Sequence, residues 1–310
     1  MMIKPCALKP GSTLGIVGPS SPVDPADLYN AKRCLEDIGY TVILGDSCTK
    51  AYGYLAAIDD IRAGDLNRMF SDAAVDAVVC MRGGYGAMRL LDRLDYAAAA
   101  EHPKPLIGFS DITALHIAYG KFSSLVTFHG PMPVSSFKDG GLDSIEQDSF
   151  DRTLKRAEPM GTVPSAFPLF TIREGVAEGM LVGGNLSLIT GLLGTPYELD
   201  TADRILFIEE VGEKSYAVDR MLTQLRLAGK LDACAGIVLG DFTGCGESMR
   251  GYNLPLSQIF EDILKPCCKP ILGGFSIGHC SHNVTLPLGV AARLDADART
   301  LTILESAVDA

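Results

Sequence analysis

Short apolar runs alternate with helical patterns through the first half of the chain. The run at residues 14–18 predicts a buried strand, and a helix is predicted to begin at Asp24 and to stop at Gly39, because apolar residues recur between them at helical spacing. Further predicted strands are residues 41–44, 77–81, 106–109 and 125–128. Since helix-compatible stretches separate these strands, the pattern predicts an α/β fold with a mostly parallel sheet and helices on both faces.

The pattern changes near residue 159, where three prolines follow within ten residues and no helical period is visible. We therefore expect an N-terminal domain at residues 1–160, a linker at 161–175 and a C-terminal domain at 176–310. Strands are predicted in the second half at residues 204–208, 236–240 and 301–304, with an antiparallel alternation from 289 to 304. The second domain is predicted to be another α/β unit with mixed or antiparallel strands.

Composition narrows the classes of partner. The 310 residues carry a formal net charge of -11, which offers no basic face for nucleic acid or for an anionic membrane surface. No apolar stretch reaches the length of a membrane-spanning helix, and no export signal is visible at the N-terminus. The nine cysteines are odd in number and irregularly spaced, as expected of reduced thiols. We expect a cytoplasmic protein that acts on a small substrate.

The sharpest local motif surrounds Ser110. The predicted strand at 106–109 runs into Gly-Phe-Ser-Asp and then into a helix, an order that exposes a serine hydroxyl at the carboxyl edge of a sheet. The next backbone N–H and the helix N-terminus could stabilise an oxyanion there. The second glycine of a Gly-x-Ser-x-Gly elbow is missing, because Ile112 occupies its place. The alternative interpretation is that Ser110 only caps the helix.

A glycine-dense segment, Cys80-Met-Arg-Gly-Gly-Tyr-Gly86, follows another predicted strand. Its glycines allow a sharp turn that points N–H groups at an anion or at a developing oxyanion. A nucleotide site is disfavoured, because no Gly-Lys-Ser/Thr sequence follows and no ribose-binding acid lies at the usual distance. Cys80 could be a thiol nucleophile, although a buried structural cysteine is the commoner case.

A serine nucleophile needs a base and an acid that orients the base. Among the five histidines, His279 lies in a loop bordered by glycines, whereas His116 points away from Ser110 along the predicted helix. A metal site made of His279, Cys280, His282 and Cys268 is the alternative, but its spacing matches no zinc pattern, and we expect neither a metal nor another cofactor. The acid would be Glu209 or Glu210, which end a predicted strand.

These motifs together resemble the LD-carboxypeptidase family of serine peptidases, which includes the microcin-immunity peptidases. The resemblance runs from residue 14 to about 295, nearly the whole chain. The matching segments are Gly18-Pro-Ser-Ser-Pro22, Arg82-Gly-Gly-Tyr-Gly86, Gly108-Phe-Ser-Asp111, His129-Gly-Pro-Met132, Gly183-Gly-Asn-Leu186, Ile208-Glu-Glu210, Asp219-Arg-Met-Leu222, Gly278-His279 and Leu286-Pro-Leu-Gly289.

The resemblance implies a triad of Ser110, Glu209 and His279, with Glu209 chosen because the family's acid is the first of the pair. It also implies an oxyanion hole from the N–H groups of Asp111 and Gly84. Two positions depart from the family pattern: Glu210 stands where Asp is usual, and Cys280 stands where Gly commonly follows the histidine. If that second position needs a positive φ, Cys280 would strain the loop.

The family's fold is an N-terminal α/β domain with a C-terminal domain of distinct topology, and its members are commonly dimers. Its activity is release of a terminal D-amino acid from cytoplasmic muropeptides in cell-wall recycling, so a muropeptide substrate and a homodimer are implied. Arg82 is a candidate for the substrate carboxylate, or a structural arginine; Asn185 is a candidate for the peptide backbone, or a helix cap. The alternatives are an immunity-type peptidase acting on peptide-nucleotide or aminoacyl-sulfamoyl conjugates, and a non-catalytic or Cys80-dependent amidotransferase-like protein.

Overall fold

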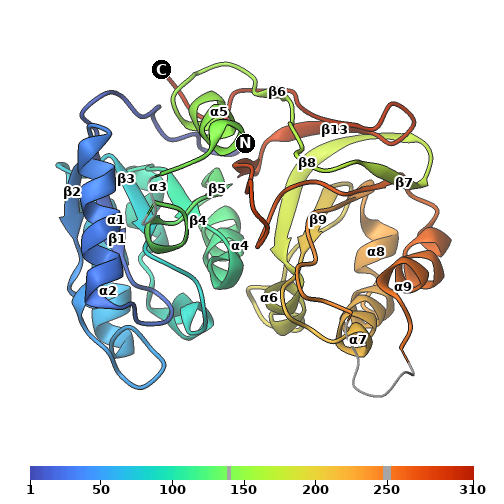
Figure 1. Ribbon diagram of the computed structural model, residues 1–310, viewed down its shortest axis with the longest axis horizontal. Helices are drawn as coiled ribbons and strands as arrows, with labels where there is room; N and C mark the ends of the chain where they lie inside the picture. The colour runs from blue at the N-terminus through green and yellow to red at the C-terminus, as the bar shows by residue number, and fades with distance from the viewer. Residues whose placement is uncertain (138–140, 247–252) are drawn as a thin grey trace. The chain divides into compact units, whose positions relative to one another are not determined.

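The structure, a computed structural model, describes residues 1–137, 141–246 and 253–310 and divides the chain into two units (Figure 1). Unit 1 comprises Met1–Pro159, Thr285–Gly289 and Ser306–Ala310. Unit 2 comprises Met160–Val284 and Val290–Glu305. Both are α/β, as the sequence predicted, and each is described by itself.

The predicted apolar strands form the sheet of unit 1. Its six strands lie in the order β12-β5-β4-β3-β1-β2, and all neighbours are parallel except β12 and β5. Their bounds are β1 Thr13–Val17, β2 Thr41–Leu44, β3 Ala77–Cys80, β4 Leu106–Gly108, β5 Thr127–His129 and β12 Leu286–Leu288. β3, β4 and β5 are buried along their whole length, as expected of strands covered on both faces.

Helices lie on both faces of this sheet. The first begins where Asp24 accepts a hydrogen bond from the N–H of Ala26 as its N-cap, so the predicted start of this helix is confirmed. On the other face, α2, α3 and α4 pack in a row. The helices of unit 1 are α1 Pro25–Asp37, α2 Asp59–Ser71, α3 Tyr96–Glu101, α4 Thr113–Phe122 and α5 Ser144–Leu154, with short turns η1 Asp46–Thr49, η2 Ala87–Arg93, η3 Ser110–Ile112 and η4 Pro133–Phe137.

Unit 2 contains a mixed sheet of eight strands in the order β6-β14-β13-β8-β9-β10-β11-β7. The central strands β8, β9, β10 and β11 are parallel, and the outer pairs are antiparallel, which confirms the mixed sheet and the antiparallel C-terminal strands. The bounds are β6 Gly161–Thr162, β7 Phe170–Arg173, β8 Val176–Asn185, β9 Ile205–Glu209, β10 Gly236–Leu239, β11 Ile271–Gly273, β13 Ala291–Asp295 and β14 Thr300–Ile303. Its helices are α6 Leu186–Gly191, α7 Ser215–Leu227, α8 Lys230–Ala233 and α9 Leu256–Ile263, with η5 Lys265–Cys267.

The predicted domain boundaries need two corrections. Residues 161–175 are not a linker, because β6 and β7 lie within them and pair with β14 and β11 of the second sheet. The C-terminal domain is not continuous either, since β12 pairs with β5 of unit 1. Chain-end residues also return to unit 1, where the N–H of Asp309 donates to the carbonyl of Pro5 (2.8 Å).

In each unit the carboxyl ends of the parallel strands meet at one edge. In unit 1 this edge carries the loops after β1, β3, β4 and β5; in unit 2 it carries the segments after β8, β9, β10 and β11. Such edges are where α/β sheets place binding and catalytic groups. The sequence-predicted site residues lie at these two edges.

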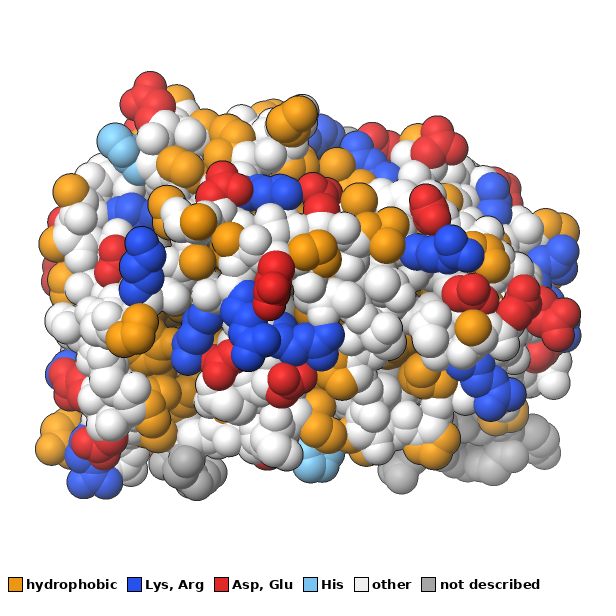
Figure 2. All heavy atoms as spheres, turned by 90° about the horizontal axis from the view of Figure 1, so that it is seen from above, with side chains coloured by type: hydrophobic (Ala, Val, Ile, Leu, Met, Phe, Trp, Pro, Cys, Tyr) orange, Lys and Arg blue, Asp and Glu red, His pale blue; other side chains and the backbone are white. Residues whose placement is uncertain are grey.

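Opposite charges are interspersed on the surface. Around α5, Lys155 pairs with Asp151 (2.7 Å) and Arg152 with Asp148 (3.2 Å). Figure 2 shows the same mixture, with Lys and Arg side chains lying among Asp and Glu side chains on the face that it draws. Among the described residues, no helix has the length and apolar character needed to cross a membrane.

Candidate active site

Ser110 occupies a strained turn between strand and helix in unit 1. It follows β4 with φ of 67°, a left-handed conformation that few residues with a side chain adopt. The N-cap of η3 is Phe109 and that of α4 is Ile112, and neither makes a side-chain capping bond. The N-cap positions thus fall on Phe109 and Ile112, and the left-handed turn at Ser110 is the backbone expected of a nucleophile elbow.

The glycine loop, residues 82–86, lies against this elbow. A Cβ placed on Gly83 would lie 2.8 Å from the Cβ of Ser110, so a larger residue there would displace the serine. Gly84 has φ of +118°, which suits glycine alone. The loop and the elbow thus bring the backbone segments of both proposed oxyanion donors to one edge of the sheet in unit 1.

Glu209 and His279 form a hydrogen-bonded pair in unit 2. Glu209 ends β9 with a fully buried side chain, and its Oε2 lies 2.7 Å from Nδ1 of His279. Burial raises the pKa of Glu209, and the hydrogen bond from His279 opposes that rise. With Nδ1–H donating to a carboxylate, Nε2 is the ring nitrogen left to accept a proton, which is the arrangement of a general base.

The loop that carries His279 depends on Gly278. This glycine has φ of +122°, and a Cβ there would lie 2.6 Å from Oε2 of Glu209. The loop is closed by Asn283, whose Oδ1 accepts the Gly278 N–H (2.8 Å). The positive φ values in this loop belong to Gly278 and His282 rather than to Cys280. Cys280 therefore does not adopt a positive φ, and the backbone strain considered for this position is absent.

Glu210 has a different role from its neighbour. Its Oε1 accepts from Nδ2 of Asn185 (3.0 Å) and from the N–H of Val211 (2.9 Å). Its Oε2 accepts from the N–H (2.8 Å) and the hydroxyl (2.7 Å) of Ser187. Four hydrogen bonds saturate this carboxylate, so it joins the end of β9 to the start of α6.

Sequence comparison decides the family. The chain matches the model of the LD-carboxypeptidase N-terminal domain at residues 14–130 and that of the LD-carboxypeptidase C-terminal domain at residues 178–294. It is 43% identical to the "Probable murein peptide carboxypeptidase" of Bacillus subtilis, over 97% of this chain and 94% of that protein. The chain belongs to the LD-carboxypeptidase family. It is accordingly a serine-type peptidase.

Solved structures of related proteins share the fold. The muramoyltetrapeptide carboxypeptidase from Oxalobacter formigenes aligns with a TM-score of 0.84 and 31% identity, covering 95% of this chain and 99% of that one. The microcin C7 self-immunity protein MccF in complex with glutamyl sulfamoyl guanosine aligns with a TM-score of 0.90 and 25% identity, covering 99% of both chains. Both branches of the LD-carboxypeptidase family are thus represented among the relatives.

The remaining predicted residues of this LD-carboxypeptidase lie as follows. Arg82 is exposed and its Nη1 donates to the carbonyl of Pro22 (3.3 Å), while its role toward substrate stays a prediction. Asn185 is the N-cap of α6 and accepts the N–H of Leu188, which confirms the capping interpretation. Cys80 is fully buried, and burial raises the pKa of its thiol, which argues against a cysteine nucleophile.

His116 is also accounted for. Its Nε2 lies 2.8 Å from the carbonyl of Gly108, and burial lowers the pKa of His116 to about 4. A neutral imidazole therefore anchors the end of β4 just before the elbow. Within the described ranges, no group of three or more His, Cys, Asp or Glu side chains is arranged to hold a metal ion.

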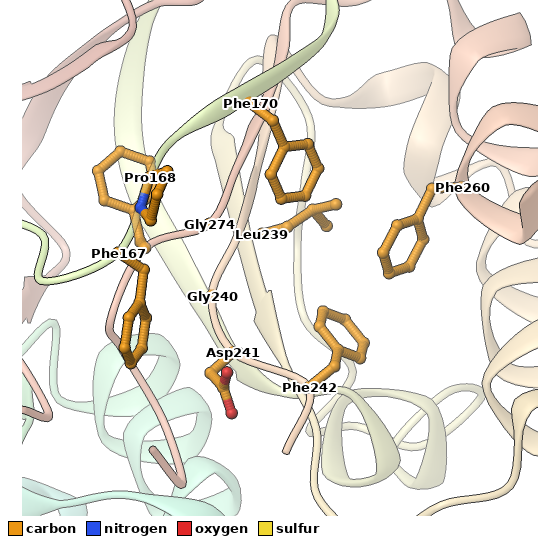
Figure 3. Close-up of a pocket in the computed structure, with 10 residues that line it drawn as sticks. Phe167, Pro168, Phe170, Leu239, Gly240, Asp241, Phe242, Phe260 and Gly274 are labelled. Atoms are coloured by element: carbon orange, nitrogen blue, oxygen red, sulfur yellow. The ribbon is translucent and has the colours of Figure 1, made fainter. Parts of the chain in front are cut away.

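Sequence reasoning missed a cavity beside the Glu209–His279 pair. The cavity, about 370 Å³, is lined by Phe167, Pro168, Phe170, Leu239, Gly240, Asp241, Phe242, Phe260, Gly274 and Phe275. Figure 3 shows the rings of Phe170, Phe242 and Phe260 around the same space. Gly240 lines the cavity and also lies against Glu209, since a Cβ on Gly240 would be 3.2 Å from the Cβ of Glu209. The lining is aromatic and apolar apart from Asp241, so a group bound there would be apolar. No periodic signal marks it, because its residues come from four separate segments.

Proposed function

We propose that the protein is a serine carboxypeptidase that cuts the L,D peptide bond of muropeptides and releases a terminal D-amino acid. Ser110, Glu209 and His279 would form its triad. The observation that carries this proposal is the left-handed Ser110 at the strand-to-helix elbow of unit 1. The buried Glu209–His279 pair of unit 2 and the match to both LD-carboxypeptidase domain models support it. Relatives named murein peptide and muramoyltetrapeptide carboxypeptidases support the substrate class.

The proposed reaction proceeds through an acyl-enzyme. Oγ of Ser110 attacks the carbonyl carbon of the scissile bond while Nε2 of His279 takes the hydroxyl proton, and the ionised Glu209 stabilises the imidazolium. The N–H groups of Asp111 and Gly84 would bind the oxyanion. Collapse breaks the C–N bond, and His279 returns the proton to the departing D-amino acid. Water, activated by His279, then hydrolyses the ester and frees Ser110.

Replacement of the nucleophile tests this mechanism. Ser110→Ala is expected to lower kcat by about 10³-fold or more, since only binding and oxyanion stabilisation remain. Ser71→Ala, at an exposed serine on α2, is the matched control and should leave kcat unchanged. The measurement is D-amino acid release from a muropeptide-type tetrapeptide, with near-UV circular dichroism as a check of folding. Activity of Ser110→Ala within tenfold of the wild type would refute the proposal.

The chirality of the terminal residue tests the substrate class. Inverting one centre moves the side chain into space shaped for hydrogen, which costs several kcal/mol when the site is closed around it. Matched L,D and L,L tetrapeptides should therefore differ by about 100-fold or more in kcat/KM. Comparable rates would reject the L,D specificity.

An immunity-type activity is the second candidate. The likeness to MccF bound to glutamyl sulfamoyl guanosine favours it, because the fold agreement there is at least as close as with the carboxypeptidase. Incubation with an aminoacyl-sulfamoyl nucleoside decides between the two. Cleavage of the nucleoside conjugate without cleavage of the tetrapeptide would assign the protein to that branch.

We also propose a homodimer that works in the cytoplasm on recycled wall fragments. The homodimer and the cytoplasmic location are both properties that the family resemblance implies. Light scattering coupled to size-exclusion chromatography would give twice the 33.0 kDa mass of the chain if the dimer forms, and cell fractionation would locate the protein.

A further inference from the structure

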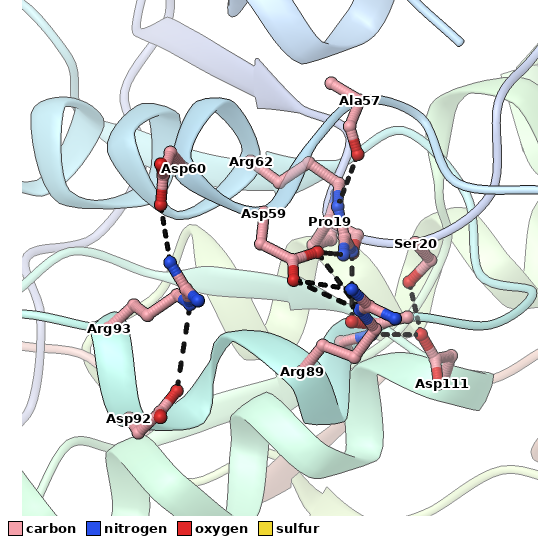
Figure 4. Close-up of polar contacts among 12 residues, drawn as sticks. Pro19, Ser20, Ala57, Asp59, Asp60, Arg62, Arg89, Asp92, Arg93 and Asp111 are labelled. Carbon is pink, nitrogen blue, oxygen red and sulfur yellow. Dashed lines mark hydrogen bonds and ion pairs between the residues drawn. The ribbon is translucent and has the colours of Figure 1, made fainter. Parts of the chain in front are cut away.

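Three loops of unit 1 meet at the side chain of Asp111 (Figure 4). Its Oδ2 accepts a hydrogen bond from the hydroxyl of Ser20 (2.6 Å), which follows β1, and another from the N–H of Ala87 (2.8 Å), which follows the glycine loop. Asp111 itself follows the elbow and is only 1% exposed. One carboxylate oxygen therefore ties the elbow to both neighbouring loops.

The glycine loop depends on such anchors for its position. The loop is bonded to neighbouring segments: the N–H of Tyr85 donates to Oγ of Ser21 (3.2 Å), the carbonyl of Gly83 accepts the N–H of Ser21 (3.4 Å), and the loop ends at the Asp111 contact through Ala87. Gly84 and Gly86, with φ of +118° and +133°, give the backbone freedom that only outside contacts can remove. A shift of this loop would move the N–H of Gly84 relative to that of Asp111.

Arg62 holds the same loops from the other side (Figure 4). This arginine is fully buried, and its Nη1 donates to the carbonyls of Gly86 (3.0 Å) and Pro19. Its charge is balanced by Asp59, whose Oδ1 lies 2.5 Å from Nη2. The cluster is thus hydrogen-bonded throughout, as a buried polar network must be if it is to define one geometry.

We propose that the Asp111 carboxylate is a positioning residue: by accepting hydrogen bonds from Ser20 and Ala87, it fixes the glycine loop against the elbow so that the two oxyanion donors converge. This inference rests on the proposed role of Ser110. The reason for this inference is that burying a carboxylate is energetically unfavourable, whereas an apolar side chain could fill the same space without that penalty. Burial correspondingly raises the pKa of Asp111, which the bonds from Ser20 and Ala87 oppose.

Unit 1 offers a matched control for the loss of the serine bond. Ser47 and Ser20 are both fully buried, and Ser47 donates its hydroxyl to the buried Asp65 at 2.6 Å, the same distance as Ser20 to Asp111. Ser47 additionally accepts the N–H of Gly18 (2.9 Å), so its removal should disturb stability at least as much. Ser20→Ala removes the hydroxyl that reaches Asp111, whereas Ser47→Ala removes one that reaches Asp65 and leaves the Ser20–Asp111 bond in place.

The experiment measures how fast a fluorophosphonate labels Ser110, together with kcat and KM. Ser20→Ala should slow labelling and lower kcat by about tenfold, with KM within about threefold, because misplaced donors weaken the transition state more than the ground state. Ser47→Ala should lower only the free energy of unfolding. Asp111→Asn keeps an amide oxygen for both donors and should recover most of the kcat lost in Asp111→Ala.

The outcomes separate this inference from the function on which it rests. A wild-type enzyme that is not labelled at Ser110 would remove the nucleophile, and with it both proposals. A labelled wild type with Ser20→Ala also labelled at the wild-type rate would overturn only the positioning role. Equal slowing by Ser47→Ala would also overturn it, since general loosening would then explain the effect. If Asp111→Ala fails to fold, the comparison of Ser20→Ala with Ser47→Ala carries the test.

Discussion

At the scale of single residues, Glu209 and Glu210 are chain neighbours whose carboxylates are used differently. Glu210 is saturated by four hydrogen bonds from its own unit. Glu209 instead directs one oxygen to Nδ1 of His279. A carboxylate with its acceptors filled by backbone and amide groups holds structure, whereas one bonded to a histidine sets the tautomer of that base.

The two glutamates should therefore respond differently to the same substitution. Glu209→Gln is expected to lower kcat by about 100-fold or more, because the amide cannot stabilise the imidazolium. Glu210→Gln puts an NH₂ group where an acceptor is needed, so it should lower the free energy of unfolding by about 1–3 kcal/mol with a much smaller effect on kcat. Steady-state kinetics and urea unfolding of both variants check this. Equal losses of kcat would mean that the carboxylates are assigned wrongly.

The same Glu209→Gln variant should reveal the raised pKa of Glu209. In the folded chain that pKa lies above its ordinary value of 4.5, so between the two values the folded state binds more protons than the unfolded state. The wild type therefore loses stability as pH rises through that window, and the amide does not. The stability of Glu209→Gln relative to wild type should be greater at pH 8 than at pH 4, as measured by urea unfolding at each pH. A difference that shrinks with rising pH would contradict the burial argument.

The sequence predicted some of these residues and left others out for a physical reason. Ser110 and His279 are marked by local patterns, a strand-to-helix turn and a glycine-bordered loop. The choice between Glu209 and Glu210 was left open by local pattern, because it depends on Asn185 and Ser187, which reach Glu210 from the end of β8 and the start of α6. Likewise, nothing local shows that Asp111 contacts Ser20, 91 residues earlier in the chain.

At the scale of elements, β8 and β9 align the site of unit 2. Asn185 and Glu209 are partners in the parallel register of these strands. Near the end of β8, Gly183 has φ of +136°, and a Cβ there would lie 1.9 Å from the carbonyl oxygen of Phe207. The close approach of the two backbones at this point requires glycine.

Gly183→Ala should consequently push β8 away from β9. We expect the free energy of unfolding to fall by about 3 kcal/mol or more, with a loss of kcat as Glu209 shifts. Gly194→Ala is the control, because Gly194 also has a positive φ (+78°) but no atom within 4 Å of the added Cβ. It should cost about 1 kcal/mol and spare kcat. Similar losses in both variants would show that backbone strain, rather than strand spacing, limits stability.

Strands were predictable where burial on both faces made continuous apolar runs, as in β1, β3 and β10. Strands β6 and β7 were not predicted because they are short, lie at the two edges of the second sheet, and belong to a segment whose prolines interrupt its apolar residues. Edge strands tolerate proline nearby and need only one partner. Composition alone therefore made this segment resemble a linker.

At the scale of the whole molecule, the last five residues belong to the first unit. The N–H of Asp309 donates to the carbonyl of Pro5 and its carbonyl accepts the N–H of Ala7, both at 2.8 Å, while Val308 is fully buried. These contacts join the two ends of the chain within unit 1. These terminal segments are too short and too irregular in their apolar spacing for the contact to be predicted from the sequence.

Deleting residues 306–310 should therefore destabilise unit 1 rather than trim a tail. We expect a fall in Tm of several degrees and slower labelling of Ser110, with earlier cleavage in unit 1 under limited proteolysis. Asp309→Ala, which keeps both backbone bonds, is the control and should behave like the wild type. A truncated protein with unchanged Tm would show that these contacts do not stabilise the unit.

The sheet of unit 1 cannot be completed on the ribosome until β12 has been synthesised, because β12 pairs with β5 but follows most of unit 2 in the chain. The edge strand Leu286–Leu288 pairs with β5, whose last residue, His129, leaves the ribosome 157 residues before it. At about 5–20 residues per second, β5 waits roughly 8–30 s for its partner. During that interval its outer edge is an unpaired strand that another chain could join. Slow translation of the second half would therefore favour aggregation through the first half, although every residue of β5 had long been made.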